Sequence, residues 1–214
     1  MKHLLGLLLV AAFFPAVLHA QKQPFEGYFD YRATVYMPDT NILVNSWNVR
    51  IYSNDTIARV ETETQLGMQV YIRHMSLNKA YLLLDFNGQR YAIQTDLEKN
   101  SEQSDSLKNK YTIKKKFGSK TIAGVKCRRY HITDTRINEE YDCYFAKKIE
   151  NKYLEVYYEI PGLAVDYYLA SEEGLVHYEL TGITLTDVNR DLFGVPADCK
   201  RITFDEFVNL FSEQ

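Results

Sequence analysis

Residues that carry much of the chemistry of enzymes and metal proteins are scarce in this sequence. Only three of the 214 residues are cysteine and five are histidine, and no histidine lies in a pattern such as His-Glu-x-x-His. Neither a Gly-x-Ser-x-Gly elbow, nor a Gly-x-Gly-x-x-Gly turn, nor a phosphate loop occurs. We therefore expect no enzyme activity, no bound metal and no cofactor.

An excess of positive charge is also missing. Lys and Arg number 25 against 28 for Asp and Glu, which gives a net charge of −3. A chain this close to neutral lacks the field that drives non-specific nucleic-acid binding, so nucleic acid is not an expected partner. With 46% hydrophobic and 25% charged residues, the composition is that of a globular protein, not of a disordered or coiled-coil chain.

The longest apolar run lies at the amino terminus. Residues 1–3 include a lysine, residues 4–14 are apolar, and Ala20 precedes a polar stretch. A charged start, a short apolar centre and a small residue at the cut are typical of a secretory signal peptide. The run is shorter than the roughly 20 apolar residues that span a bilayer. We expect residues 1–20 to be removed and residues 21–214 to form one exported domain without a transmembrane anchor.

Apolar and polar residues alternate along most of the remaining chain, and aromatic residues, which favour strands, make up 14% of the sequence. This period of two predicts strands, and Asn87-Gly88 gives the clearest hairpin turn. Strands joined by short turns pair antiparallel, and a sheet of about ten strands must curl, split or close. We therefore predict a mainly β fold with one large, curled antiparallel sheet. Its strands are expected at residues 27–37, 47–51, 56–64, 68–75, 80–86, 90–95, 111–117, 121–133, 140–149, 163–169 and 175–186.

Two segments depart from this alternation. Residues 96–110 are almost entirely polar and predict a solvated loop or a short surface helix. Thr203 and Glu206 form a capping box that starts a helix over residues 203–212. The helical spacing of its apolar residues predicts that this helix packs on the concave face of the sheet. Those residues are Phe204, Phe207, Val208 and Phe211.

The three cysteines allow one disulfide in an oxidising compartment. Cys127 and Cys143 flank a hairpin centred near Thr135, and symmetric pairing about that residue would place them opposite each other. We therefore predict a Cys127–Cys143 disulfide. Pairing of either cysteine with Cys199, or three buried thiols, are the alternatives.

Three clusters have both a functional and a structural interpretation. Cys127 and His131, with Asp142-Cys143 across the hairpin, could hold zinc, although partly exposed strand residues are the favoured interpretation. The lysine-rich stretch 108–120, with Arg128 and Arg129, could face phosphate head groups or an acidic partner, but a lysine-protected edge strand is favoured. The tyrosines between residues 153 and 168 could line a ligand surface or occupy half-buried sheet positions.

Three short motifs resemble a known family. The sequence reads Lys-Thr-Ile-Ala-Gly-Val-Lys-Cys at residues 120–127, Tyr-Glu-Ile-Pro-Gly-Leu-Ala-Val at residues 158–165 and Phe-Gly-Val-Pro at residues 193–196. In this order and spacing they resemble the GLPGLI-type family of exported bacterial envelope proteins, which looks related to the lipoprotein-carrier half-barrels of the LolA and LolB type. The family's Gly-Leu-Pro-Gly-Leu-Ile reads Glu-Ile-Pro-Gly-Leu-Ala here. The resemblance implies a half-barrel in the periplasm or envelope of a two-membrane bacterium and carries over no catalytic residue.

A curled sheet covered by an apolar helix would enclose an apolar groove of ligand size. We therefore expect a non-enzymatic protein that binds or carries a lipid or another hydrophobic molecule. The same side chains could instead form a filled core, which would make the protein a structural or interaction module with an envelope protein as partner. The residues expected to line the groove are Phe29, Tyr31, Trp47, Val49, Leu82, Leu84, Val165, Tyr167, Tyr178, Phe207 and Phe211.

Overall fold

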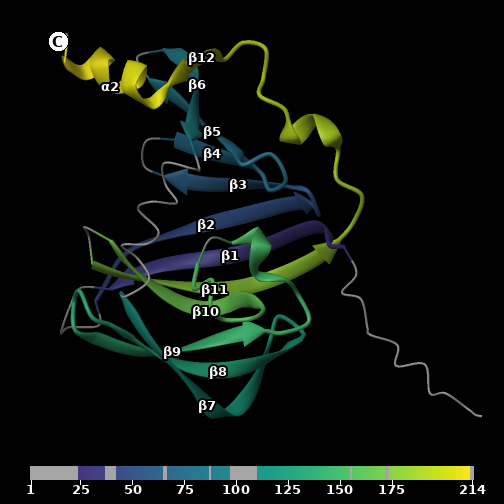
Figure 1. Ribbon diagram of the computed structural model, residues 1–214, viewed down its shortest axis with the longest axis vertical. Coiled ribbons are helices and arrows are strands. Elements are labelled where there is room, and N and C mark those ends of the chain that lie inside the picture. Colours follow the sequence, from purple (N-terminus) through teal and green to yellow (C-terminus); the bar gives the residue numbers. More distant parts are fainter. Residues whose placement is uncertain are drawn as a thin grey trace, which may run out of the picture.

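The computed structural model describes residues 24–36, 42–64, 67–86, 88–96, 110–154, 156–171 and 174–212. The expected signal peptide and nearly all of the polar stretch 96–110 lie outside the described residues. Twelve strands form a single sheet, in the order β12-β6-β5-β4-β3-β2-β1-β11-β10-β9-β8-β7 (Figure 1). They are β1 (Glu26–Tyr36), β2 (Leu43–Asn54), β3 (Ile57–Thr64), β4 (Gly67–His74), β5 (Lys79–Phe86), β6 (Gln89–Asp96), β7 (Tyr111–Ile122), β8 (Val125–Asp134), β9 (Glu139–Ala146), β10 (Leu163–Ser171), β11 (Gly174–Leu185) and β12 (Lys200–Thr203).

The sheet is largely antiparallel, as the short turns predict. Two runs of consecutive strands, β1 to β6 and β7 to β11, meet where β1 pairs with β11. The exception is β12, a four-residue strand that the sequence did not reveal and that pairs parallel with β6. Parallel pairing is possible there because a long stretch of chain separates the two strands. The half-barrel curvature of the sheet stays a prediction.

Most strand boundaries agree with the prediction to within a few residues, but the hairpin of β7 and β8 differs. The prediction ended one strand at residue 117 and began the next at residue 121, whereas β7 continues to Ile122 and the chain turns at Ala123-Gly124. Ala123 and Gly124 have φ angles of 45° and 78°, as a tight two-residue hairpin turn requires. Gly118, with φ of 111°, instead lies in a bulge where the register shifts between Lys115 and Ser119.

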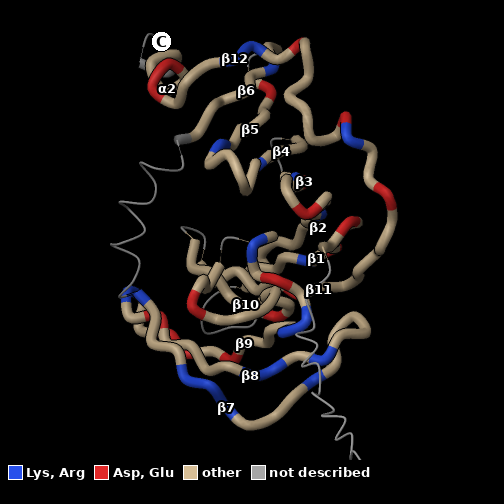
Figure 2. The backbone as a smooth tube through the Cα atoms, turned by 45° about the vertical axis from the view of Figure 1, so that its right-hand side comes forward, with Lys and Arg blue, Asp and Glu red and all other residues tan. Residues whose placement is uncertain are grey.

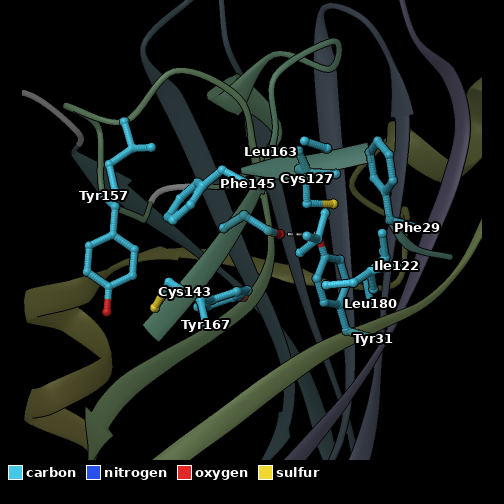
Figure 3. Close-up of a cluster of buried hydrophobic side chains, with 14 of the residues drawn as sticks. Phe29, Tyr31, Ile122, Cys127, Cys143, Phe145, Tyr157, Leu163, Tyr167 and Leu180 are labelled. Carbon is cyan, nitrogen blue, oxygen red and sulfur yellow. Dashed lines mark hydrogen bonds between the residues drawn. The ribbon is translucent and has the colours of Figure 1, made fainter. Parts of the chain in front are cut away.

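The largest hydrophobic core lies on one face of β1, β2 and β8 to β11, and the chain itself covers it. The segment between β9 and β10 folds over this face and contains a short 3-10 helix, η1 (Asn151–Tyr153). The ring of Tyr153 lies 5.6 Å from Phe25 and 5.7 Å from Phe29, and Tyr157 contacts Phe145 at 6.0 Å. Figure 3 shows Phe29, Phe145 and Tyr157 among the buried side chains of this core. Side chains of this segment therefore pack onto the core face of β1 and β9.

The carboxy-terminal chain encloses the other end of the sheet from both faces. Residues 186–199, which include the 3-10 helix η2 (Arg190–Phe193), run past β3 toward β6, and Val195 and Cys199 join a cluster with Leu83. The neighbouring Leu82 and Leu84 belong to a separate cluster with the helix α2 (Phe204–Ser212). Because successive strand residues point to opposite faces, the segment and the helix lie on opposite sides of β5.

The helix α2 begins as predicted, since the backbone N–H of Thr203 donates to Glu206 Oε2 at 2.6 Å and the N–H of Glu206 donates to Thr203 Oγ1 at 3.2 Å. The strand register places Leu82 in one row with Ile51 and Phe29, so α2 packs on the face that carries the main core. It covers only the β5–β6–β12 end of that face, because it directly follows the edge strand β12 and is nine residues long. Among the described residues, no helix has the length and apolarity to cross a membrane.

The three cysteines are buried free thiols. The register corrects the expectation that Cys127 and Cys143 lie opposite each other, because Tyr130 pairs with Cys143. The turn of this hairpin spans Thr135 to Asn138 and is not centred on Thr135, which offsets the two cysteines by three residues. That offset is roughly 10 Å along the strands, whereas a disulfide bridges Cα atoms less than about 7 Å apart.

Candidate functional site

The structure places the residues predicted to line a groove in two separate clusters. Seven of them belong to the main core or border it. Phe29, Tyr31, Val49, Val165 and Tyr167 are buried, and Trp47 and Tyr178 are half-buried against them. The second cluster, around α2, holds Leu82, Leu84 and Phe207. Phe211 lies in the last turn of α2, and its side chain is not among those that the structure describes.

The main cluster is packed and its polar atoms are satisfied. The hydroxyl of Tyr31 donates to the carbonyl oxygen of Ala164 at 2.7 Å (Figure 3). The ring of Tyr167 lies edge-on to Tyr31 at 6.1 Å and stacks on Tyr178 at 5.0 Å. Burial raises the pKa of Tyr31 and of Tyr167 well above the ordinary value for tyrosine. These side chains pack against one another in the main hydrophobic core, and their role in lining a ligand groove stays a prediction.

Two hollows lie instead on the opposite, polar face of the sheet, which we call the back face. The larger, of about 380 Å³, is lined by polar residues of β1, β2 and β3 together with Met68. Its charges are largely paired, since Arg50 Nε lies 2.6 Å from Asp30 Oδ1 and Arg59 Nε lies 2.7 Å from Glu61 Oε1. The Arg50 guanidinium also lies 4.5 Å from the centre of the Tyr28 ring.

The second hollow, of about 340 Å³, lies over β2, β1 and β11, and we call it the His177 hollow. The imidazole of His177 is held from two sides: its ring stacks on Tyr168 at 4.4 Å, and its Nε2 lies 2.8 Å from Asp166 Oδ1. Asp166 and Tyr168 belong to the neighbouring strand β10. The residues that line the hollow are Arg32, Thr34, Tyr36, Leu43, Ser46, His177 and Glu179.

Asp166 is a buried carboxylate, with 7% of its surface exposed. Burial alone would raise the pKa of Asp166. Hydrogen bonds from His177 and from Lys120 Nζ, which lies 3.1 Å from Oδ2, have a larger effect and hold the pKa below its ordinary value. An ionised carboxylate only accepts hydrogen bonds, so Nε2 of His177 carries the hydrogen that it donates. In the neutral ring, Nδ1 is then an acceptor. No hydroxyl or thiol of the described chain donates a hydrogen bond to this ring.

Opposite charges also remain unpaired in the His177 hollow. Arg32 and Glu179 are directly opposite in the β1–β11 register, and both line the hollow. Neither takes part in an ion pair within the ranges that the structure describes. The hollow therefore combines an oriented imidazole with a guanidinium and a carboxylate that form no ion pair with the described residues.

Sequence reasoning missed this site. His177 was one isolated histidine, and Asp166 was hidden in the run Leu163–Leu169 that the pattern predicts as a strand. The signal was the predicted turn Ser171–Gly174, because a hairpin about that turn brings Tyr168 opposite His177 and places Asp166 two pairs further along, on the same face. The residues considered as zinc ligands are also separated by the structure. Cys127 and Cys143 are buried in the core, whereas His131 Nδ1 lies 3.2 Å from Asp142 Oδ1 outside that core.

Comparisons with known families and with curated proteins find no match for this chain. The resemblance to the GLPGLI-type family therefore stays a resemblance. Solved structures do match in fold. PNGF-II aligns with a TM-score of 0.52 and 9% identity over 87% of this chain and 33% of its own. An uncharacterised conserved protein from Thermus thermophilus aligns with a TM-score of 0.51 and 9% identity over 83% of this chain and 91% of its own.

MucB, solved in complex with MucA(peri), aligns with a TM-score of 0.40 and 12% identity over 84% of this chain and 57% of its own. At these identities the first two likenesses concern the fold alone. This chain spans a third of the PNGF-II chain but corresponds to nearly the whole Thermus protein. The twelve-stranded sheet is thus an architecture found in other proteins, and the site must be interpreted from its own residues.

Proposed function

We propose that this protein is an exported, non-enzymatic binding protein of the bacterial cell envelope, and that it recognises a small polar ligand in the His177 hollow. The observation that carries the proposal is the unpaired Arg32 and Glu179 beside the oriented His177. The packing of the main core is consistent with this proposal, since Tyr31, Tyr167 and Tyr178 contact one another there. The envelope location rests on the signal-like amino terminus and on the three sequence motifs.

The chemistry of the hollow defines the class of ligand. The Arg32 guanidinium matches a carboxylate, which it can bind through two hydrogen bonds. Glu179 and Nδ1 of His177 accept hydrogen bonds from an ammonium or a hydroxyl group. Tyr36 and Leu43 supply an apolar border. A small amino acid or hydroxy acid presents these groups together, and a hollow of about 340 Å³ can accommodate one.

The test is a titration followed by NMR at the His177 ring. We expect shifts on adding leucine or 2-hydroxyisocaproate, and none with leucinamide, which lacks the carboxylate. Arg32→Gln should weaken binding at least tenfold, because one bidentate charged contact is lost. Arg50→Gln, in the neighbouring hollow, is the matched control and should bind normally. Equal binding of leucine and leucinamide, or normal binding by Arg32→Gln, would contradict the proposal.

A second candidate is the hydrophobic carrier, with its ligand on the core face between the two clusters. The observation that favours it is a row of half-buried residues, Val60, Tyr71 and Leu82, that continues from Ile51 across neighbouring strands. An acyl chain along this row would lie between the segment 147–162 and α2, and each buried methylene would contribute about 0.8 kcal/mol.

Organic extraction and native mass spectrometry of the purified protein test the carrier. A discrete co-purifying lipid mass supports it, and Phe207→Ser should then reduce lipid retention, because Phe207 packs at one end of this row. Phe204→Ser, at a side chain that is 58% exposed, is the matched control. A ligand-free mass, with no uptake of added phospholipid, would rule the carrier out.

A further inference from the structure

We propose that the edge of the sheet formed by β7 and β8 is a docking surface for an anionic phospholipid membrane. Three observations combine there: a fully exposed aromatic residue, a concentration of exposed lysines that form no ion pair with the described residues, and a break in strand pairing at the same place. This inference is independent of the ligand proposed for the His177 hollow, which lies on other strands.

The exposed aromatic residue is Phe117, at the centre of the β7 bulge. Pairing with β8 is present at Lys115 and resumes at Ser119, so Lys116, Phe117 and Gly118 have no partners in the ladder. Phe117 has a relative exposure of 101%, the largest among the exposed apolar side chains of the described chain. A side chain this exposed contributes little to the packing of the fold, so a phenylalanine at this place in the bulge requires another explanation.

The sequence segment around Phe117 carries charge of one sign. Between Asp105 and Asp134 the sequence contains no acidic residue, although acidic residues outnumber basic ones in the chain as a whole. Figure 2 shows the resulting basic segments along β7 and β8. Two of these cations are paired with acids of other strands, Lys120 with Asp166 and Arg129 with Asp142. The exposed cations without an ion pair within the described ranges are Lys114, Lys115, Lys116, Lys126 and Arg128.

Membrane binding explains the residues of this surface better than protection against edge-to-edge strand pairing does. Lysines and a bulge are enough to prevent two sheet edges from pairing, and neither needs an exposed phenylalanine. The combination of an aromatic ring that enters the interfacial layer with lysines that meet phosphate groups is the chemistry of peripheral membrane binding. Since β7 is the last strand of the sheet, the surface can approach a flat bilayer without a clash from another strand of the sheet.

Co-sedimentation with vesicles tests the proposal. The purified protein should bind vesicles of phosphatidylcholine and phosphatidylglycerol (7:3) and should be released as salt rises, because the attraction is screened. Lys114→Gln/Lys115→Gln/Lys116→Gln should weaken binding at least tenfold, and Phe117→Ser several-fold. Phe117→Trp should show a blue shift of its emission on these vesicles and none on pure phosphatidylcholine.

Matched controls carry the same changes at the far end of the sheet. Lys79→Gln/Lys200→Gln/Arg201→Gln removes three exposed cations there, and Leu77→Ser removes an apolar side chain that is 62% exposed. Both should bind vesicles normally. No binding to the anionic vesicles at low salt would overturn the proposal. So would equal losses in the control and the β7 triple variants, which would mean attraction by overall charge only.

Discussion

The two ends of the sheet are stabilised in different ways. At the β7–β11 end, together with β1, a large aromatic core lies under the chain's own segment 147–162. Phe29 and Tyr31 are at most 1% exposed there. At the β3–β6 end, the sheet carries a small cluster on each face, one under residues 186–199 and one under α2. The first end is stabilised by deeply buried aromatic side chains. The second end is stabilised by the carboxy-terminal chain, which covers both of its faces.

This difference predicts which end of the sheet can unfold locally. Fully buried aromatic side chains lose many contacts together if the first end opens, so that end should unfold only with the whole protein. The second end depends on short contacts made by α2 and β12, whose neighbours are themselves half-buried. Local opening is therefore expected at β5, β6 and β12, which is also the end where the carrier hypothesis places its ligand.

The largest expected effect is the loss of a core ring. Phe29→Ala removes a side chain that stacks on Phe25 at 4.1 Å and contacts Tyr153, and it should lower the free energy of unfolding by about 3–5 kcal/mol. Phe207→Ala, at the other end, should cost only about 1–2 kcal/mol because its ring is half-buried. Urea unfolding of both variants measures the contrast. Equal losses would mean that the two ends unfold as one equally packed unit.

The fold was largely accessible from the sequence because alternation is a local signal. It located eleven strands and the capped helix, since burial of one sheet face forces the period of two. The strand β12 escaped because four residues carry no period and its partner β6 is remote in the sequence. The turn at Ala123-Gly124 was missed because the predicted strands were separated at residues 118–120, where the structure has a bulge, and only the register distinguishes a bulge from a turn.

The site was less accessible, for a physical reason. An apolar residue on a strand follows the same sequence pattern whether it packs against a ligand or against the chain's own loop. The pattern at Phe29 and Tyr167 therefore could not show that both lie in the main buried cluster. The His177 hollow depends on which residues of β1, β10 and β11 stand side by side. That arrangement is a property of pairing, which composition and spacing do not contain.

A smaller effect is expected at the buried carboxylate of the first end. Asp166→Asn removes the charge that faces His177 and Lys120 and should cost about 1–3 kcal/mol at neutral pH. Because the pKa of Asp166 is lowered in the folded state, its contribution is fully present above the unfolded pKa of about 4. It is lost as the pH falls through the lower folded pKa.

Urea unfolding across acidic pH measures this contribution. The wild type should lose stability below about pH 4, and Asp166→Asn should lose less over the same range. Asp198→Asn is the matched control at the second end, because its carboxylate pairs with Arg90 but is 63% exposed. It should leave the pH profile unchanged. Identical profiles for the wild type and Asp166→Asn would show that the lowered pKa of Asp166 does not contribute.

A local effect is expected at the start of α2. Thr203→Ala removes the hydroxyl that accepts from the backbone N–H of Glu206 and should destabilise the helix by about 1 kcal/mol. Hydrogen exchange should quicken in β6 and β12, which α2 covers, while exchange in β1 and β11 stays unchanged. Thr184→Ala, on β11, serves as the control. Faster exchange at both ends would mean that the carboxy-terminal chain stabilises the whole sheet.

The smallest effect concerns the thiols, which report on both ends without a mutation. Burial raises the pKa of Cys143 to about 12 and raises that of Cys127 as well, so both should alkylate slowly from the native state. Cys199 lies at the second end, under the carboxy-terminal chain, and should react first because local opening exposes it. Mass spectrometry after timed alkylation gives the order. Denaturation without reductant should label all three, whereas a single labelled cysteine would show that the protein forms the disulfide that the strand register opposes.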